Sequence, residues 1–150
     1  MKRTVLVIVA VLVCLTAVLA VVHLKTRDKV PEGSLLIQFD GGESYVRIDA
    51  LDIVQINGTI VSAKGDAQDI HQSGVRVEDV LKKAGIDCQA IHTATAIADD
   101  EFSAELLPEE IMAPDVAYLA KEADGSMRLI VFGDSNMKRN VRNVVKLVVR

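Results

Sequence analysis

An uncharged apolar run near the N-terminus constrains this chain more than any other feature. Residues 4–22 contain almost only Val, Leu, Ile and Ala, and Lys2 and Arg3 precede them. A helix needs about 20 apolar residues to cross the roughly 30 Å hydrocarbon core of a bilayer, so this run is just long enough. It predicts one N-terminal transmembrane helix, which divides the 150-residue chain into an anchor and a following domain.

The two basic residues at the N-terminus set the expected orientation. By the positive-inside rule they keep the N-terminus in the cytoplasm and place the domain outside. We therefore expect residues 1–25 to form a signal anchor, residues 26–34 a linker and residues 35–150 a single extracytoplasmic domain. A cleavable signal peptide with its cleavage site near Ala20 is the alternative, although the apolar run continues past that residue.

Charge and composition exclude nucleic acid as a partner. Of the 17 Lys and Arg in the chain, three lie in residues 1–25, which leaves 14 against 21 Asp and Glu in the domain. The whole chain has three Phe, two Tyr and no Trp. An acidic domain with so few aromatic residues lacks both the electrostatic attraction and the stacking surfaces that nucleic acids require.

The remaining pattern predicts an α+β domain of mostly short β-strands with one or two short helices. The best helix is 75–84, where four apolar residues at helical spacing form one stripe: Val77, Val80, Leu81 and Ala84. A second short helix, 108–112, begins with a proline that loses no needed hydrogen bond there. Strands are expected at 35–39, 45–48, 52–63 (interrupted by a hairpin or bulge at Asn57-Gly58), 90–98, 102–106, 116–122, 127–132 and 141–149.

Several segments in order carry a resemblance to a known family. They are GVRVEDVL at 74–81 with AGI at 84–86, FSAEL at 102–106 with PEEI at 108–111, VAYL at 116–119 with DG at 124–125, MRLIVFGD at 127–134 and VRNVVKL at 141–147. Over residues 48–149 this order resembles the oxidoreductase molybdopterin-binding domain family. The resemblance implies a fold of the sulfite-oxidase type and, in a complete member, a molybdopterin cofactor.

One residue that the family's chemistry needs is missing. That chemistry depends on a cysteine thiolate, a soft ligand that suits molybdenum. The corresponding region, residues 56–66, contains Ser62 but no cysteine, and Cys88 lies beyond the helix. We therefore expect a reduced member without a cofactor, a membrane-anchored and non-catalytic binding module. The alternative is a molybdopterin-dependent oxidoreductase subunit that retains the pterin through backbone and basic contacts.

Five basic residues are candidates for binding a small anionic ligand or a protein partner: Lys64, His71, Lys138, Arg139 and Arg142. His71 is expected in the loop before the helix, where backbone N–H groups favour negative charge. The last three, together with Lys146, form a basic cluster in an otherwise acidic domain. The alternatives are a solvated loop histidine and the outward face of an edge strand. If residues 64–71 and 133–142 converge in the fold, they mark the ligand site. No catalytic residue and no metal site are predicted.

Overall fold

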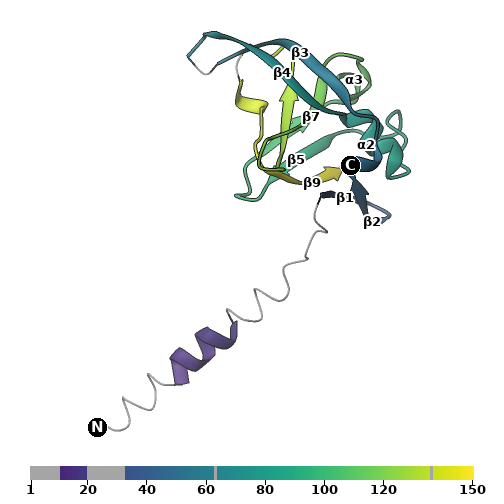
Figure 1. Cartoon of the computed structure of the whole chain (residues 1–150). Helices are drawn as coiled ribbons and strands as arrows, with labels where there is room; N and C mark the ends of the chain where they lie inside the picture. The colour runs from purple at the N-terminus through teal and green to yellow at the C-terminus, as the bar shows by residue number, and fades with distance from the viewer. Residues whose placement is uncertain (1–10, 20–32, 63, 136) are drawn as a thin grey trace.

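The computed structural model shows a helical segment and an α+β domain made mostly of strands with few short helices, as the sequence predicts (Figure 1). It describes four stretches of the chain, without the side chain of residue 137: residues 11–19, 33–62, 64–135 and 137–150. Residues 11–19 are helical, and no helix among the described residues is long and apolar enough to cross a membrane. The predicted span over residues 4–22 and the linker over 26–34 lie largely outside the described residues.

The first sheet has the strand order β2-β1-β9-β5-β6. It consists of β1 (Ser34–Phe39), β2 (Gly42–Arg47), β5 (Ala94–Ala98), β6 (Ser103–Leu106) and β9 (Val144–Val149). The C-terminal strand β9 pairs in parallel with β1 and antiparallel with β5, so the two ends of the domain meet in the middle of this sheet.

The second sheet has the strand order β3-β4-β7-β8, and all its pairs are antiparallel. It consists of β3 (Val54–Val61), β4 (Ala67–Arg76), β7 (Ala117–Lys121) and β8 (Met127–Val131). Strands β3 and β4 form a long hairpin, and only the last residues of β4, from Gly74 onward, pair with β7. The tip of this hairpin therefore extends beyond the rest of the sheet (Figure 1).

The larger hydrophobic core lies between the two sheets and includes the apolar face of α2 (Val77–Lys83). Its members include Leu35, Ile37, Leu81, Leu119, Leu129 and Leu147. A smaller core lies on the other face of the second sheet, where the β3–β4 hairpin packs against β7 and β8, and it includes Ile56, Ile60, Ile70, Tyr118 and Ile130. Side chains alternate across a strand, so β7 and β8 contribute to both cores.

Three further short helices connect the strands: η1 (Ile48–Ala50), α3 (Pro108–Met112) and η2 (Met137–Arg139). The predicted bounds of α3 are confirmed, with proline at its first position. The apolar stripe of the other helix is also confirmed, but α2 begins at Val77 because the two residues before it complete β4. Strands β7 and β8 flank the predicted hairpin turn at Asp124-Gly125.

The prediction of a hairpin or bulge at Asn57-Gly58 is wrong. Strand β3 runs straight through both residues, and they pair in register with His71 and Ile70. The hairpin turns later, where the Ser62 N–H donates to the Asp66 carbonyl at 2.7 Å. A Cβ at Gly58 would lie 2.6 Å from the ring of Phe132, so this glycine allows the ring to approach the hairpin.

The C-terminal strand is shorter than predicted, and the set of residues on its buried face differs from the prediction. The period of two in this segment predicts that residues 145, 147 and 149 share one face of a half-buried strand. Instead Val145 is 38% exposed and Val144 is 5% exposed. The register with β5 shifts between Ile97 and Ala98, which pair with Lys146 and Val144. A bulge of this kind inserts one residue and so reverses the alternation. Strand β5 likewise begins at residue 94 rather than at 90.

Candidate functional site

A cavity of about 470 Å³ opens between the two sheets. In the first sheet it lies where β1 and β9 begin and β5 ends. In the second sheet it lies where β7 ends and β8 begins, beside the second half of β4. Residues from η1 and from Ile53 complete the wall. Six separate stretches of chain therefore meet at this one place. Its volume falls within the range of about 300–1,000 Å³ that is usual for small-molecule sites.

The wall of the cavity is mostly apolar. Ile48, Val75 and Val144 are buried and form its inner part. Two other lining residues are exposed: Ile53 keeps 57% of its surface accessible and Val145 keeps 38%. Apolar side chains thus run from the solvent side of the cavity to its interior. Such a lining suits the apolar body of a ligand.

A few polar groups complete the wall, among them Asp49, Asp99 and Lys121. Arg47 holds the Asp49 carboxylate with two hydrogen bonds, from Nη2 at 2.6 Å and from Nε at 3.1 Å. These bonds lower the pKa of Asp49, and the charge of Lys121 lowers it further. The carboxylate of Asp99 forms no hydrogen bond or ion pair with any other described residue. It is a charged group at the cavity that a ligand can engage.

Asn143 is a further polar residue of the wall and has an unusual backbone conformation. Its φ is +53°, in the left-handed region that asparagine tolerates better than most residues. Its carbonyl accepts a hydrogen bond of 3.1 Å from the N–H of Asp99. This bond ties the start of β9 to the end of β5 and so fixes the backbones of Asn143 and Asp99 relative to each other.

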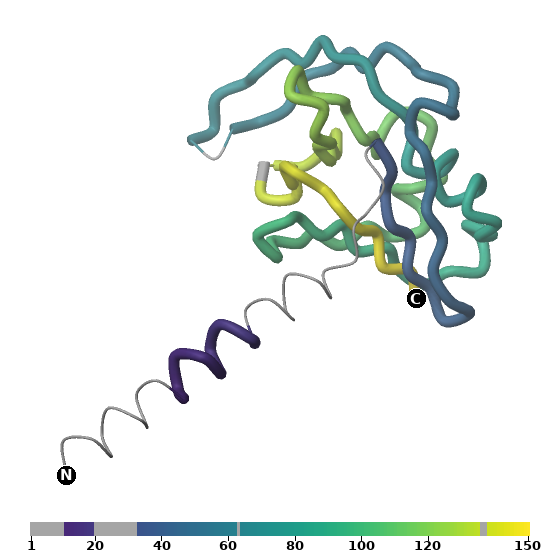
Figure 2. Tube along the Cα trace, turned by 60° about the horizontal axis from the view of Figure 1, so that its bottom comes forward, coloured from purple at the N-terminus to yellow at the C-terminus, as the bar shows by residue number. Residues whose placement is uncertain are grey.

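The predicted anion-binding residues lie elsewhere, and none of the five lines this cavity. Lys64 lies in the turn of the β3–β4 hairpin, and Lys138 and Arg142 are exposed. In both views the tip of that hairpin lies on the same side of the domain as η2 (Figures 1 and 2). The two segments thus come to one side, as the anion-site hypothesis requires, but binding of an anion there stays a prediction.

The predicted position of His71 is wrong. His71 lies inside β4, not in a loop before the helix, and Arg76, five residues further on, is the residue that precedes α2. Its Nδ1 lies 2.9 Å from the Asn57 side-chain oxygen on the paired strand β3. The alternating pattern of the strand places this ring on the solvent side of the hairpin, away from the helix N-terminus.

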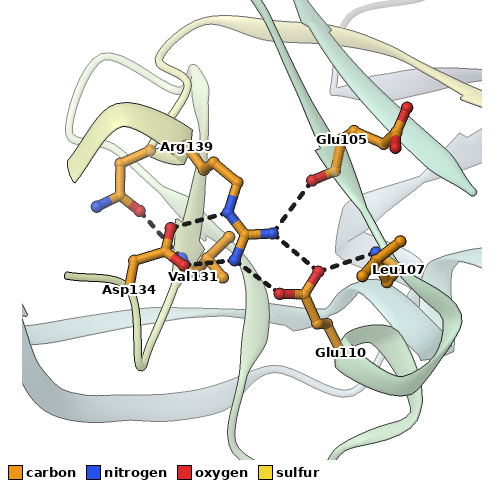
Figure 3. Close-up of polar contacts among 7 residues, drawn as sticks. Glu105, Leu107, Glu110, Val131, Asp134 and Arg139 are labelled. Atoms are coloured by element: carbon orange, nitrogen blue, oxygen red, sulfur yellow. Dashed lines mark hydrogen bonds and ion pairs between the residues drawn. The ribbon is translucent and has the colours of Figure 1, made fainter. Parts of the chain in front are cut away.

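Arg139, the central residue of the predicted basic cluster, is bound between two carboxylates (Figure 3). Its guanidinium donates to both oxygens of Glu110, at 2.6 and 2.8 Å. It also donates to both oxygens of Asp134, from Nε at 2.9 Å and from Nη2. A further bond of 3.2 Å reaches the Glu105 carbonyl. We call these residues the Arg139 cluster; they join η2 to α3 and to the end of β6.

In the Arg139 cluster one guanidinium faces two carboxylates, so its positive charge is fully compensated. The two carboxylates raise the pKa of Arg139, and the guanidinium lowers the pKa of Glu110. Glu110 also accepts the Leu107 N–H at 2.9 Å, which caps the first turn of α3. Because two acids already surround Arg139, this residue is better explained as a structural connection than as an anion receptor.

The residues present do not fit the molybdenum ligand of the resembled family. In the corresponding region, the Ser62 hydroxyl accepts the backbone N–H groups of Lys64 and Asp66 and stabilises the turn. Cys88 is buried, and its burial raises the pKa of the thiol. Among the described residues no three His, Cys, Asp or Glu side chains are grouped so that they could hold a metal ion.

Sequence reasoning missed the cavity residues because no local signal marks them. Asp49, Asp99 and Lys121 each look like ordinary surface charges, and they meet only when six segments assemble. Comparisons with known proteins add no further assignment. No model of a known protein family matches the chain, and no curated protein matches it.

Proposed function

We propose that this protein is a membrane-anchored, extracytoplasmic and non-catalytic module that binds a small molecule in the cavity between its sheets. The observation that carries the proposal is the cavity itself, with an apolar inner wall and, beside it, the carboxylate of Asp99, which pairs with no other residue in the described part of the chain. An apolar lining with a few convergent polar groups is the usual form of a ligand site. The anchor is the predicted span over residues 4–22.

We further propose that the domain is a reduced relative of the sulfite-oxidase type. The resembling segments support this, because each coincides with a helix or strand of the described domain. The first contains α2, the second joins β6 to α3, and the next two form β7 and β8. The last contains most of β9. Since the Ser62 hydroxyl stabilises a turn where a thiolate ligand would be needed, we propose no molybdopterin chemistry for this chain.

Three compounds that share an indole ring but differ in net charge test the binding proposal. The full chain, in nanodiscs of the anionic lipid phosphatidylglycerol, would be titrated calorimetrically with indole, tryptamine and indole-3-acetate. We expect saturable binding, strongest for tryptamine because its ammonium can reach Asp99. Ser126→Phe, which places a ring at the cavity wall, should weaken binding at least about tenfold, equivalent to about 1.4 kcal/mol.

The control variant is Phe102→Leu, at an exposed residue that does not line the cavity. It should bind all three compounds as the unaltered chain does. If none of the three compounds binds saturably, the proposal is refuted. Molybdenum that copurifies with the native chain in stoichiometric amount would refute the non-catalytic assignment and favour the molybdopterin-dependent oxidoreductase.

A further inference from the structure

The position of the cavity relative to the predicted anchor suggests where its ligand comes from. Gly33 and Ser34 line the cavity, and they are the first described residues of the domain. Only residues 23–32 separate them from the end of the apolar run at residue 22. Ten residues span at most about 36 Å when fully extended. A bilayer that holds the anchor therefore lies within this distance of the cavity.

The exposed part of the cavity lining includes apolar side chains, whereas a site for a water-soluble ligand would be expected to have a polar rim. Ile53 and Val145 both line the cavity and are exposed. They come from distant parts of the chain, since Ile53 precedes β3 of the second sheet and Val145 belongs to β9 of the first. Exposed apolar side chains that gather at one opening are typical of an interaction site. Here they continue into the buried wall at Val144 and Ile48.

Charges of both signs line the cavity. Lys121 and Asp99 line the cavity with opposite charges, while Arg47 neutralises Asp49. A phosphate and an ammonium in one head group match this arrangement. An anionic lipid fits less well, because the domain carries more Asp and Glu than Lys and Arg and is repelled by an anionic surface.

We infer that the cavity takes up a zwitterionic membrane lipid, with an acyl chain along the apolar wall and the head group between Asp99 and Lys121. This inference rests on the proposed binding function and on the proposed anchor. It assigns the ligand class, an amphiphile delivered from the adjacent bilayer, and gives Ile53 and Val145 the role of guiding the chain into the cavity.

Photolabelling tests this inference on the full chain. Nanodiscs would contain phosphatidylcholine and a lysophosphatidylcholine with a photoreactive diazirine in its acyl chain. After irradiation, peptide mass spectrometry would locate the labelled residues. We expect labels in residues 48–53, 73–75 and 143–145 in addition to the apolar run. An Ile53→Lys, Val145→Lys double variant should lower labelling of the cavity peptides by at least about fivefold, since charged side chains at the rim oppose entry of an acyl chain.

The matched control is Phe102→Lys, because Phe102 is 52% exposed and does not line the cavity. It should leave the labelling unchanged, and circular dichroism should show all variants folded. Saturable indole binding together with lipid labels confined to residues 4–22 would overturn this inference and leave the binding function intact. Loss of both signals would overturn both. A chain that does not remain in the bilayer would also overturn it.

Discussion

The Arg139 cluster and the cavity gather charged residues in opposite ways. In the Arg139 cluster, two carboxylates and a carbonyl surround one guanidinium, and every side chain has a partner (Figure 3). At the cavity, the Asp99 carboxylate has no such partner among the described residues and lines a hollow of about 470 Å³. The comparison teaches that charged residues close together in the sequence can be paired within the fold and so stabilise it. Charged residues far apart in the sequence can remain available for a ligand.

The largest expected effect comes from removing the guanidinium of the Arg139 cluster. Arg139→Met leaves the carboxylates of Glu110 and Asp134 facing each other, with only 20% and 21% of their side chains exposed. Loss of one partner from a mostly buried ion pair costs about 3 kcal/mol of unfolding free energy. Urea denaturation followed by circular dichroism measures this loss.

The same variant also tests the separation of the two regions. If the Arg139 cluster is structural, the folded Arg139→Met chain binds tryptamine as the unaltered chain does. Lys82→Met is the control: it removes an exposed ammonium from Glu78, which remains paired with Arg76, and should therefore cost much less stability than Arg139→Met. A selective loss of ligand binding with no loss of stability would break the comparison.

The second effect concerns pH. Arg139 lowers the pKa of Glu110 in the folded chain, so the ionised carboxylate stabilises the fold above the unfolded pKa of about 4.3. This contribution is lost as the pH falls through the lower folded pKa. Glu110→Gln should therefore cost about 2 kcal/mol at pH 7, and the difference from the unaltered chain should shrink below about pH 4.

Urea unfolding at several pH values between 2.5 and 7 would follow this difference. Glu109→Gln, at the exposed neighbouring position, is the matched control and should show no comparable pH dependence. A cost for Glu110→Gln that stays constant over the whole range would mean that its charge does not contribute to the Arg139 cluster.

The parts of the fold that sequence predicted depend on local signals. Pro108 fixes the start of α3, and Asp124-Gly125 turns the chain between two apolar runs. The failures depend on distant partners. Gly58 looks like a turn residue but makes room for Phe132, and the exposure of Val145 follows from a bulge opposite β5. No pattern within either segment contains that information.

The same distinction applies to the sites. Sequence identified Arg139 as part of a basic cluster, but the neutralisation of Arg139 involves Glu110, which lies on another element. The cavity was missed altogether, because Asp99, Lys121 and Asn143 come from three separate segments. A cavity between sheets results from how the side chains pack, and no residue type in the sequence predicts it.

A smaller effect is expected from reversing one charge at the cavity. Lys121→Glu adds a carboxylate near Asp99 and removes the ammonium, at an exposed position. Tryptamine should bind about fivefold more tightly and indole-3-acetate about fivefold more weakly, which corresponds to about 1 kcal/mol each. Calorimetric titration measures both. Indole, which has no charge, is the internal control, and equal shifts for all three compounds would contradict an electrostatic origin.

The smallest effect should come from Arg47, whose pair with Asp49 resembles the Arg139 cluster in geometry but is exposed. Their side chains are 69% and 54% accessible, so Arg47→Met should not change stability measurably. It should, however, release the Asp49 carboxylate at the cavity wall. We expect about twofold tighter binding of tryptamine by calorimetry, and unchanged binding of indole.

The pH dependence of this small gain identifies its source. Arg47 lowers the pKa of Asp49 chiefly through its hydrogen bonds, so in Arg47→Met that pKa returns upward toward its ordinary value. The added affinity for tryptamine should then disappear as the pH falls below about 4, where the freed carboxylate becomes protonated. A gain that persists in acid would show that Arg47 limits access to the cavity by its size rather than by its charge.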